Sequence, residues 1–214
     1  MEHTILARAR KLATATIGDV LDLNGFHGII SGIPRRSGEG RIAGFAQTMH
    51  GQVGPLGTFT FADFSVGAAF DAIEEDSMLM IDLGGADVST FGGLAALTVS
   101  RRKSAGVVID GGCRDIEEIR AQGVSVASRH VTPRTGKGRL KVVSLGTPVC
   151  CGGVTVKSGD LVVMDDTGTA VIPSGMIETI LHAAEELDRR DMAFAEHLRS
   201  GMSFTKSAAK LQHA

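Results

Sequence analysis

An arginine and an aspartate stand side by side, as Arg114 and Asp115, directly after a short apolar run in the middle of the chain. Val107 to Asp110 is predicted to form a buried strand, which the glycines and cysteine at 111–113 end with a turn. Ligands of open α/β sheets collect at the carboxyl ends of strands. A guanidinium fork there suits a carboxylate or an enolate, and a carboxylate suits a hard cation.

The same pair of residues also has a purely structural interpretation. Asp115 is a favourable N-cap for a helix predicted over Ile116 to Gln122, and its spacing from Glu118 matches a capping box. Arg114 is then a surface charge. The motif alone leaves both interpretations open.

A second feature is the glycine pair Gly92-Gly93, which precedes a helix predicted over Leu94 to Lys103. The first N–H groups of a helix have no partner within it, so the helix start is a ready site for a carboxylate or a phosphate. No Lys-Ser/Thr signature follows, which excludes a Walker P-loop. An ordinary tight turn is the alternative.

The elements around these two features are predicted to bring them to one edge of a sheet. Apolar strands alternate with helices in the order 78–83, 94–103, 107–110, 116–122 and 124–127. Right-handed crossovers make such strands parallel neighbours. The glycine pair and the Arg-Asp pair are therefore expected at the same edge.

The flanking segments predict two N-terminal helices and a β-rich second half. The helices are expected at 4–11 and 16–23, and the later strands at 140–145, 154–157, 161–164 and 170–172. Asp165 to Gly168 joins the last two strands and is interpreted as a hairpin turn, because Asp and Gly suit turns. The basic loop that contains Lys137 is expected to be solvated, which leaves no lysine for a Schiff base.

A C-terminal helix is predicted to begin after a Ser174 cap and to end near Gly201. Asp191 falls in the middle of its apolar stripe. A carboxylate in such a place is costly unless it is paired or functional, which makes Asp191 a candidate site residue. Local pairing with Arg189 or Arg190 and exposure at a frayed end are the alternatives.

The composition excludes several classes of protein. The 22 basic residues nearly balance the 24 acidic ones, and Trp and Tyr are absent, which argues against a nucleic-acid partner. No apolar run approaches the ~20 residues of a membrane span, and the N-terminus lacks a signal-peptide pattern. Cys113, Cys150 and Cys151 match neither a zinc spacing nor a disulfide framework. A reduced, cytoplasmic protein with a single domain over residues 1–214 is expected.

Four stretches of the sequence together resemble the RraA-like family. They are Gly106 to Asp115, Gly123, Arg129 to Pro133 and Gly153 to Val163, within a similarity that runs from about residue 16 to 201. The family includes regulators of ribonuclease activity A and class II 4-hydroxy-4-methyl-2-oxoglutarate aldolases. The resemblance implies an α/β, three-layer β/β/α fold of the swivelling-domain type, assembled as a homotrimer or homohexamer with intersubunit sites.

The resemblance also implies a lyase that cleaves or decarboxylates a small 2-oxo acid, such as oxaloacetate, through a pyruvate enolate. By position, Asp115 would hold Mg²⁺ or Mn²⁺, and Asp191 would enter a neighbouring subunit's active site. Arg114 would bind the pyruvyl group of the substrate, and the backbone at the helix start would bind its carboxylate. The implied substrate-binding residues are Gly92, Gly93, Leu94, Ala95 and Arg114.

The implied chemistry agrees with the residue types. An enolate oxygen needs a positive partner, which a hard cation supplies as a Lewis acid and Arg114 supplies as a fork that keeps its proton. One position departs from the family, because aldolase members generally carry Asp or Glu where this chain has Gly93. This departure favours the alternative, a non-catalytic regulator that binds a ribonuclease or another protein. A related enzyme with a different sugar-acid or oxo-acid substrate is the third possibility.

Overall fold

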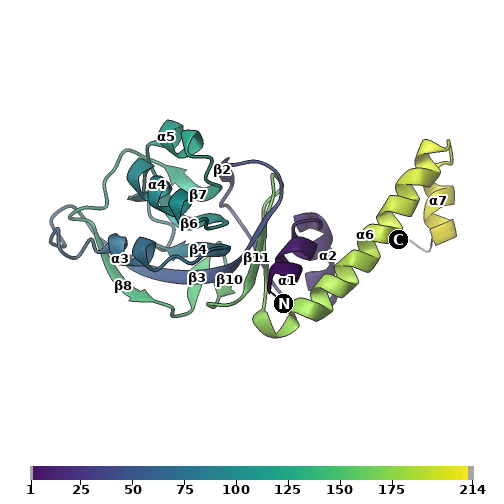
Figure 1. Cartoon of the computed structure of the whole chain (residues 1–214), viewed down its shortest axis with the longest axis horizontal. Helices are drawn as coiled ribbons and strands as arrows, with labels where there is room; N and C mark the ends of the chain where they lie inside the picture. Colours follow the sequence, from purple (N-terminus) through teal and green to yellow (C-terminus); the bar gives the residue numbers. More distant parts are fainter. Residues whose placement is uncertain (1, 212–214) are drawn as a thin grey trace.

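Four parallel strands form the centre of the structure, a computed structural model that describes residues 2–211 (Figure 1). They lie in a ten-stranded mixed sheet in the order β3 (Ile42–Val53), β4 (Ser77–Asp82), β6 (Gly106–Cys113) and β7 (Val126–Val131). The helices α4 (Gly93–Arg101) and α5 (Ile116–Ala121) connect the last three of these strands. The predicted parallel βαβ units are confirmed.

Shorter strands complete the sheet on both sides of this centre. Antiparallel strands extend it beyond β3 as β11 (Leu161–Met164), β12 (Thr169–Ile172) and β1 (Ile29–Ile30), and beyond β7 as β2 (Arg35–Ser37). Two further strands pair with β6 and β3, namely β5 (Ser89–Phe91) and β8 (Leu140–Leu145).

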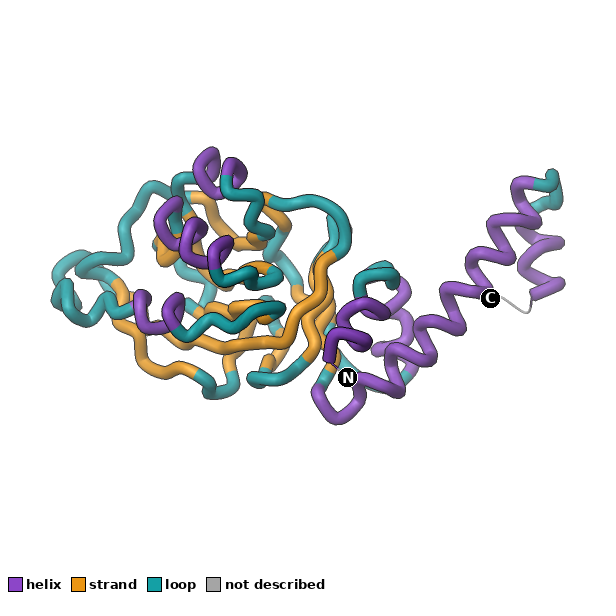
Figure 2. Tube along the Cα trace, in the orientation of Figure 1, coloured by secondary structure: helices purple, strands orange, loops and turns teal. Residues whose placement is uncertain are grey.

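Helices cover one face of the sheet (Figure 2), and a β-hairpin covers the other. Leu79 and Ile81 of β4 face a core under α3 (Val66–Asp71), α4 and α5. Met78 and Met80, which alternate with them, face the hairpin of β9 (Val149–Cys151) and β10 (Val154–Val156). Because successive side chains of a strand point to opposite faces, one apolar run serves both cores. The expected three-layer β/β/α fold is confirmed.

A separate helical group packs against the β11–β12 end of the sheet. It consists of α1 (Glu2–Ala9), α2 (Thr14–Leu23) and the first half of α6 (Ile177–Arg199). The rest of α6 extends away from the sheet, and α7 (Phe204–Leu211) folds back on it (Figure 1). Within residues 2–211, none of the helices has the length and apolar character needed to cross a membrane.

Two sequence predictions about element ends are wrong. Strand β6 does not end at Asp110 but continues through Cys113, because Gly111 and Gly112 permit close packing. A Cβ at Gly111 would lie 2.7 Å from the Leu83 side chain, and one at Gly112 only 2.8 Å from Thr132. The glycines therefore allow neighbours to approach the strand instead of turning it.

The second correction concerns the C-terminal helix. Ser174 does not cap it but begins a 3₁₀ turn (Ser174–Met176), and α6 starts at Ile177. The Ser174 N–H instead donates to Asp160 Oδ1 at 2.9 Å. The helix ends close to the predicted place, at Arg199, followed by Gly201 with a φ of 88°.

Asp165 has the structural role that its sequence context predicts. Its carboxylate accepts hydrogen bonds from the Thr14 N–H at 2.9 Å and hydroxyl at 2.6 Å, and from the N–H groups of Thr167 and Gly168 in its own turn. It thus ties the start of α2 to the β11–β12 hairpin. Burial acts to raise the pKa of Asp165, but these hydrogen bonds outweigh burial and lower it.

Replacing Asp165 with asparagine is expected to lower the free energy of unfolding by about 1–3 kcal/mol at pH 7, as for loss of buried charge-assisted hydrogen bonds. A carboxyl whose pKa is lowered on folding stabilises above its unfolded pKa, near 3.9, and loses that effect as pH falls through its folded pKa. The deficit of Asp165→Asn should therefore shrink in urea titrations at pH 3. A deficit that is the same at both pH values would contradict this role. Asp19→Asn, a change at an exposed aspartate of α2, is the control.

Candidate functional site

The glycine pair and the Arg-Asp pair line one cavity of about 340 Å³ at the carboxyl end of β6. The structure thus brings together all the residues of the predicted substrate and metal set, namely Gly92, Gly93, Leu94, Ala95, Arg114 and Asp115. Gly92 is the N-cap of α4, so the N–H groups at the start of this helix open onto the cavity. The helix start that the sequence predicted is confirmed.

Asp115 caps a different helix from the one its sequence position suggests. Its backbone is left-handed, with φ 55° and ψ 46°, and its side chain makes no capping hydrogen bond to α5. Instead, Asp115 Oδ2 accepts from the Gly93 N–H of α4 at 3.2 Å. The capping box with Glu118 is therefore wrong, because the left-handed turn directs the carboxylate away from α5.

Arg114 lies beside this carboxylate, with its Nε 3.4 Å from Asp115 Oδ2. Its backbone N–H donates to the Phe91 carbonyl at 2.9 Å, so β5 fixes its position without using the guanidinium. A Cβ at Gly92 would lie 2.6 Å from Asp115 Oδ2 and 3.1 Å from Arg114 Cγ. The glycine is needed for the side chains of Arg114 and Asp115 to approach the helix start.

Glu118 is a further candidate site residue, which the sequence pattern had assigned to capping alone. It lines the same cavity, one helical turn after Asp115. A Cβ at Gly93 would lie 1.8 Å from Glu118 Oε2, so this carboxylate fills the space that a side chain at position 93 would need. The three-residue spacing between Asp115 and Glu118 was the signal in the sequence, because it puts both acidic residues at the start of one helix.

The remaining wall of the cavity is mixed in character. Its apolar part is formed by Phe64, Val66, Phe70 and Phe91. Its polar part includes Thr135 and the exposed Lys137, both from the loop before β8. The prediction that no lysine is placed in the site is therefore wrong. The cavity carries two cationic and two acidic side chains, which suits a small substrate bearing carboxylates and a cation.

The donor set fits a hard divalent cation. Asp115 and Glu118 supply carboxylate oxygens, and Mg²⁺ is usually bound by one or two carboxylates while keeping several waters. Across residues 2–211, no group of three or more His, Cys, Asp or Glu side chains is arranged to hold a metal ion. A dedicated cage of protein ligands, such as structural zinc requires, is thus not present in that range.

Asp191 lies on α6, which packs mainly against α2 and α7. This helix lies beyond β11, at the other end of the sheet from α4 and α5 (Figure 1). A single chain therefore does not bring Asp191 to Arg114 and Asp115. Its contribution to a neighbouring subunit's site stays a prediction.

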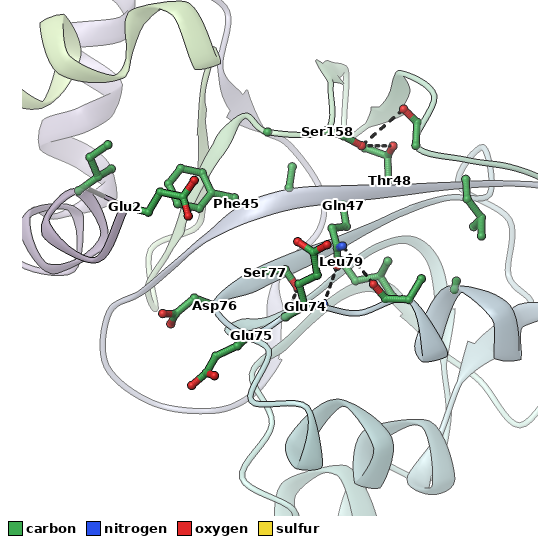
Figure 3. A pocket seen from close by; sticks show the side chains of 17 residues that line it. Glu2, Phe45, Gln47, Thr48, Glu74, Glu75, Asp76, Ser77, Leu79 and Ser158 are labelled. Carbon is green, nitrogen blue, oxygen red and sulfur yellow. Dashed lines mark hydrogen bonds between the residues drawn. The ribbon is translucent and has the colours of Figure 1, made fainter.

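A larger cavity, of about 670 Å³, lies near the start of β4 and contains none of the predicted site residues (Figure 3). Glu2, Glu74, Glu75 and Asp76 contribute acidic side chains to it. Asp76 accepts a 2.6 Å hydrogen bond from Arg10, which joins α1 to the sheet. This cavity is at the amino ends of the strands, where ligands of α/β sheets are not usually bound.

The chain is similar in sequence to several known proteins. The family model described as "RraA-like: Aldolase/RraA" matches residues 14–171. Protein DlpA of Legionella pneumophila is 29% identical over 170 residues, which are 79% of this chain but only 27% of that protein. A Halalkalibacterium halodurans protein named "Putative 4-hydroxy-4-methyl-2-oxoglutarate aldolase" is 28% identical over 193 residues, covering 90% of this chain and 87% of that protein.

Solved structures share the fold. An uncharacterized protein from Pseudomonas syringae pv. tomato has a TM-score of 0.86 at 23% identity, over 96% of each chain. Streptomyces coelicolor RraAS2, described as an unusual member of the RNase ES inhibitor RraA protein family, has a TM-score of 0.78 at 23% identity, over 88% of this chain and 94% of that one. With a family model that matches most of its length and a β/β/α architecture shared with these structures, this chain belongs to the RraA-like family.

Proposed function

We propose that the chain is a divalent-metal-dependent lyase that cleaves or decarboxylates a small 2-oxo acid through a pyruvate enolate. One observation carries the proposal: the carboxylates of Asp115 and Glu118 both lie at the start of α4, and Arg114 lies beside that of Asp115. Carboxylates for a cation and cationic donors for an enolate are the two requirements of this reaction.

Each residue then has a defined role in the cavity. The N–H groups of Leu94 and Ala95 have no partner within α4 and would bind the substrate carboxylate. Arg114 would donate its fork to the 2-oxo group and stabilise the charge that develops there, and Lys137 is placed for a second anionic group. Asp115 and Glu118 would hold Mg²⁺ or Mn²⁺, which supplies Lewis-acid stabilisation of the enolate when bound.

Glu118 also bears on the departure from the aldolase pattern at position 93. Aldolase members generally carry an acidic residue there, and the Glu118 carboxylate occupies the space beside the Gly93 Cα. This position supports the view that Glu118 supplies, from α5, the acidic group that aldolase members supply from the position of Gly93. This weakens the sequence argument for a non-catalytic protein.

A non-catalytic regulator of a ribonuclease is the second candidate function. It is favoured by the name of the Streptomyces coelicolor relative and by Leu94, whose side chain is 85% exposed next to the cavity. An exposed leucine on a helix start suits contact with another protein. This candidate predicts a protein without oxo-acid turnover that binds a ribonuclease through α4.

Pyruvate formation from oxaloacetate separates the two candidates. We expect the purified protein to release pyruvate with Mg²⁺ well above a protein-free control that contains the same metal, and to lose this activity in EDTA. Absence of protein-dependent pyruvate with both Mg²⁺ and Mn²⁺ would contradict the lyase.

Replacing Glu118 with glutamine is expected to raise the Mg²⁺ concentration needed for activity by roughly tenfold or more, since glutamine keeps the shape of the side chain but loses the charge that binds the cation. The measurement is the Mg²⁺ concentration that gives half-maximal pyruvate formation. Glu117→Gln is the matched control, because Glu117 is exposed on the same helix and does not line the cavity. Identical dependence of activity on Mg²⁺ concentration in the two variants would show that Glu118 does not bind the metal.

We also propose that the chain assembles as a trimer or hexamer in which Asp191 serves a neighbouring site as a proton donor or water-orienting group. Asp191→Asn should then lower kcat without dissociating the oligomer. Mixing it with inactive Asp115→Asn subunits should restore part of the activity, because some interfaces pair two intact halves. A stable monomer in light scattering, or mixed oligomers without regained activity, would contradict this role.

A further inference from the structure

Three arginines line a cavity of about 690 Å³ that lies apart from the site described above. Arg35 and Arg36 come from the edge strand β2, and Arg120 comes from the last turn of α5. Asp115 precedes this short helix, so the two cavities lie at its opposite ends. We propose that the arginine-lined cavity binds a phosphate group, as inorganic phosphate or as a small phosphate monoester.

Arg35 is a largely buried arginine with two donor atoms that have no hydrogen-bond acceptor among the described residues. Its side chain is only 7% exposed, and its Nη1 donates to the Gly40 carbonyl at 2.8 Å and to Asp166 Oδ1 at 2.9 Å. Its Nε and Nη2 are buried and have no acceptor among the residues that the structure describes. Buried donors without acceptors are costly, more so when they carry charge.

The counter-charge available to Arg35 is weak. The Asp166 side chain is 86% exposed, so solvent screens its attraction for Arg35. An exposed aspartate can also move away from the guanidinium at little cost. An entering dianion can therefore replace Asp166 at Arg35.

The other two arginines are held in place by neutral acceptors. Arg36 donates through Nε to the Ser128 carbonyl at 3.1 Å and through Nη2 to the Arg129 carbonyl at 2.8 Å. Arg120 donates through Nε to the Arg36 carbonyl at 3.2 Å. Carbonyl groups orient a guanidinium without neutralising it, so the charge stays available. Side chains ordered before binding lose less entropy when a ligand arrives.

The shape and charge of the cavity select the ligand class. Guanidinium forks match the oxygen edges of a tetrahedral phosphate, which can accept from several forks at once. Glu39 and Asp166 are the two acidic residues in the lining, so the three arginines leave an excess of positive charge. A doubly charged phosphate gains more from this arrangement than a monocarboxylate such as acetate.

Titration calorimetry of the full chain with inorganic phosphate, methyl phosphate and acetate tests the proposal. We expect saturable phosphate binding at millimolar concentrations or tighter, and acetate binding that is much weaker. Tighter binding of inorganic phosphate identifies the free ion as the ligand, and tighter binding of methyl phosphate identifies an ester. Acetate binding equal to that of phosphate would overturn the assignment.

Two substitutions with opposite expected effects make the test specific. Arg120→Gln removes an exposed arginine and should weaken phosphate binding about tenfold, as for loss of a charge-assisted contact. Asp166→Asn removes the competing carboxylate and should strengthen it. Arg101→Gln, at the exposed end of α4 outside this cavity, is the control and should bind phosphate like the unaltered protein. No binding by the unaltered protein, or equal binding by all three variants, would overturn the proposal.

Discussion

Replacing Asp115 with asparagine is expected to lower Mg²⁺-dependent pyruvate formation by at least ~10²-fold, the range typical of losing one transition-state-stabilising group. The physical reason is the loss of charge at the proposed cation ligand. Asparagine keeps the two features that the structure requires of this position. It tolerates the left-handed backbone, and its side-chain oxygen can still accept from the Gly93 N–H.

The thermal midpoint of Asp115→Asn should therefore stay within a few degrees of the unaltered protein, because the cap on α4 survives. Initial rates of pyruvate formation and thermal unfolding, measured on the same preparation, separate loss of the metal ligand from loss of the fold. Retained activity would contradict the assignment of Asp115. Loss of activity together with a large fall in the thermal midpoint would show that its role is structural.

Replacing Arg114 with lysine is expected to lower kcat/KM by ~10²-fold or more. Lysine keeps the positive charge but has no planar fork, so it cannot donate two parallel hydrogen bonds to a carboxylate or an enolate. The backbone of this position is held by the Phe91 carbonyl, which does not depend on the side chain. The change should therefore affect turnover and leave the fold unchanged.

Arg134→Lys provides a matched control, because Arg134 is an exposed arginine paired with Asp87 outside the cavity. Its kcat/KM should be that of the unaltered protein. A loss in Arg114→Lys no larger than in this control would identify Arg114 as an ordinary surface arginine.

The βαβ centre of the fold follows from the sequence because its signal is local. Apolar runs such as 78–83 and glycine-bounded helices are visible in a short window, and the crossover rule then fixes the parallel order. The short strands β1, β2 and β5 have no such signal, since they form only where a long-range partner is present.

The candidate site could be located from the sequence but not completed. The spacing of Asp115 and Glu118 fits both a capping box and a shared site, and only the left-handed backbone of Asp115 decides between them. Lys137 joins the cavity from a loop that is far away in the sequence. The burial of Arg35 likewise depends on tertiary packing, which no local pattern in the sequence shows.

The central claim is that Asp115 and Glu118 hold a divalent cation beside Arg114. Oxalate, a planar dianion that resembles pyruvate enolate, provides a direct test when Mn²⁺ binding is followed by electron paramagnetic resonance of the unbound ion. We expect the protein to bind Mn²⁺, and to bind it more tightly with oxalate. Asp115→Asn should abolish this binding, and Arg114→Lys should remove most of the oxalate effect. Mn²⁺ binding that is the same in the unaltered protein, Asp115→Asn and Glu118→Gln would contradict the account.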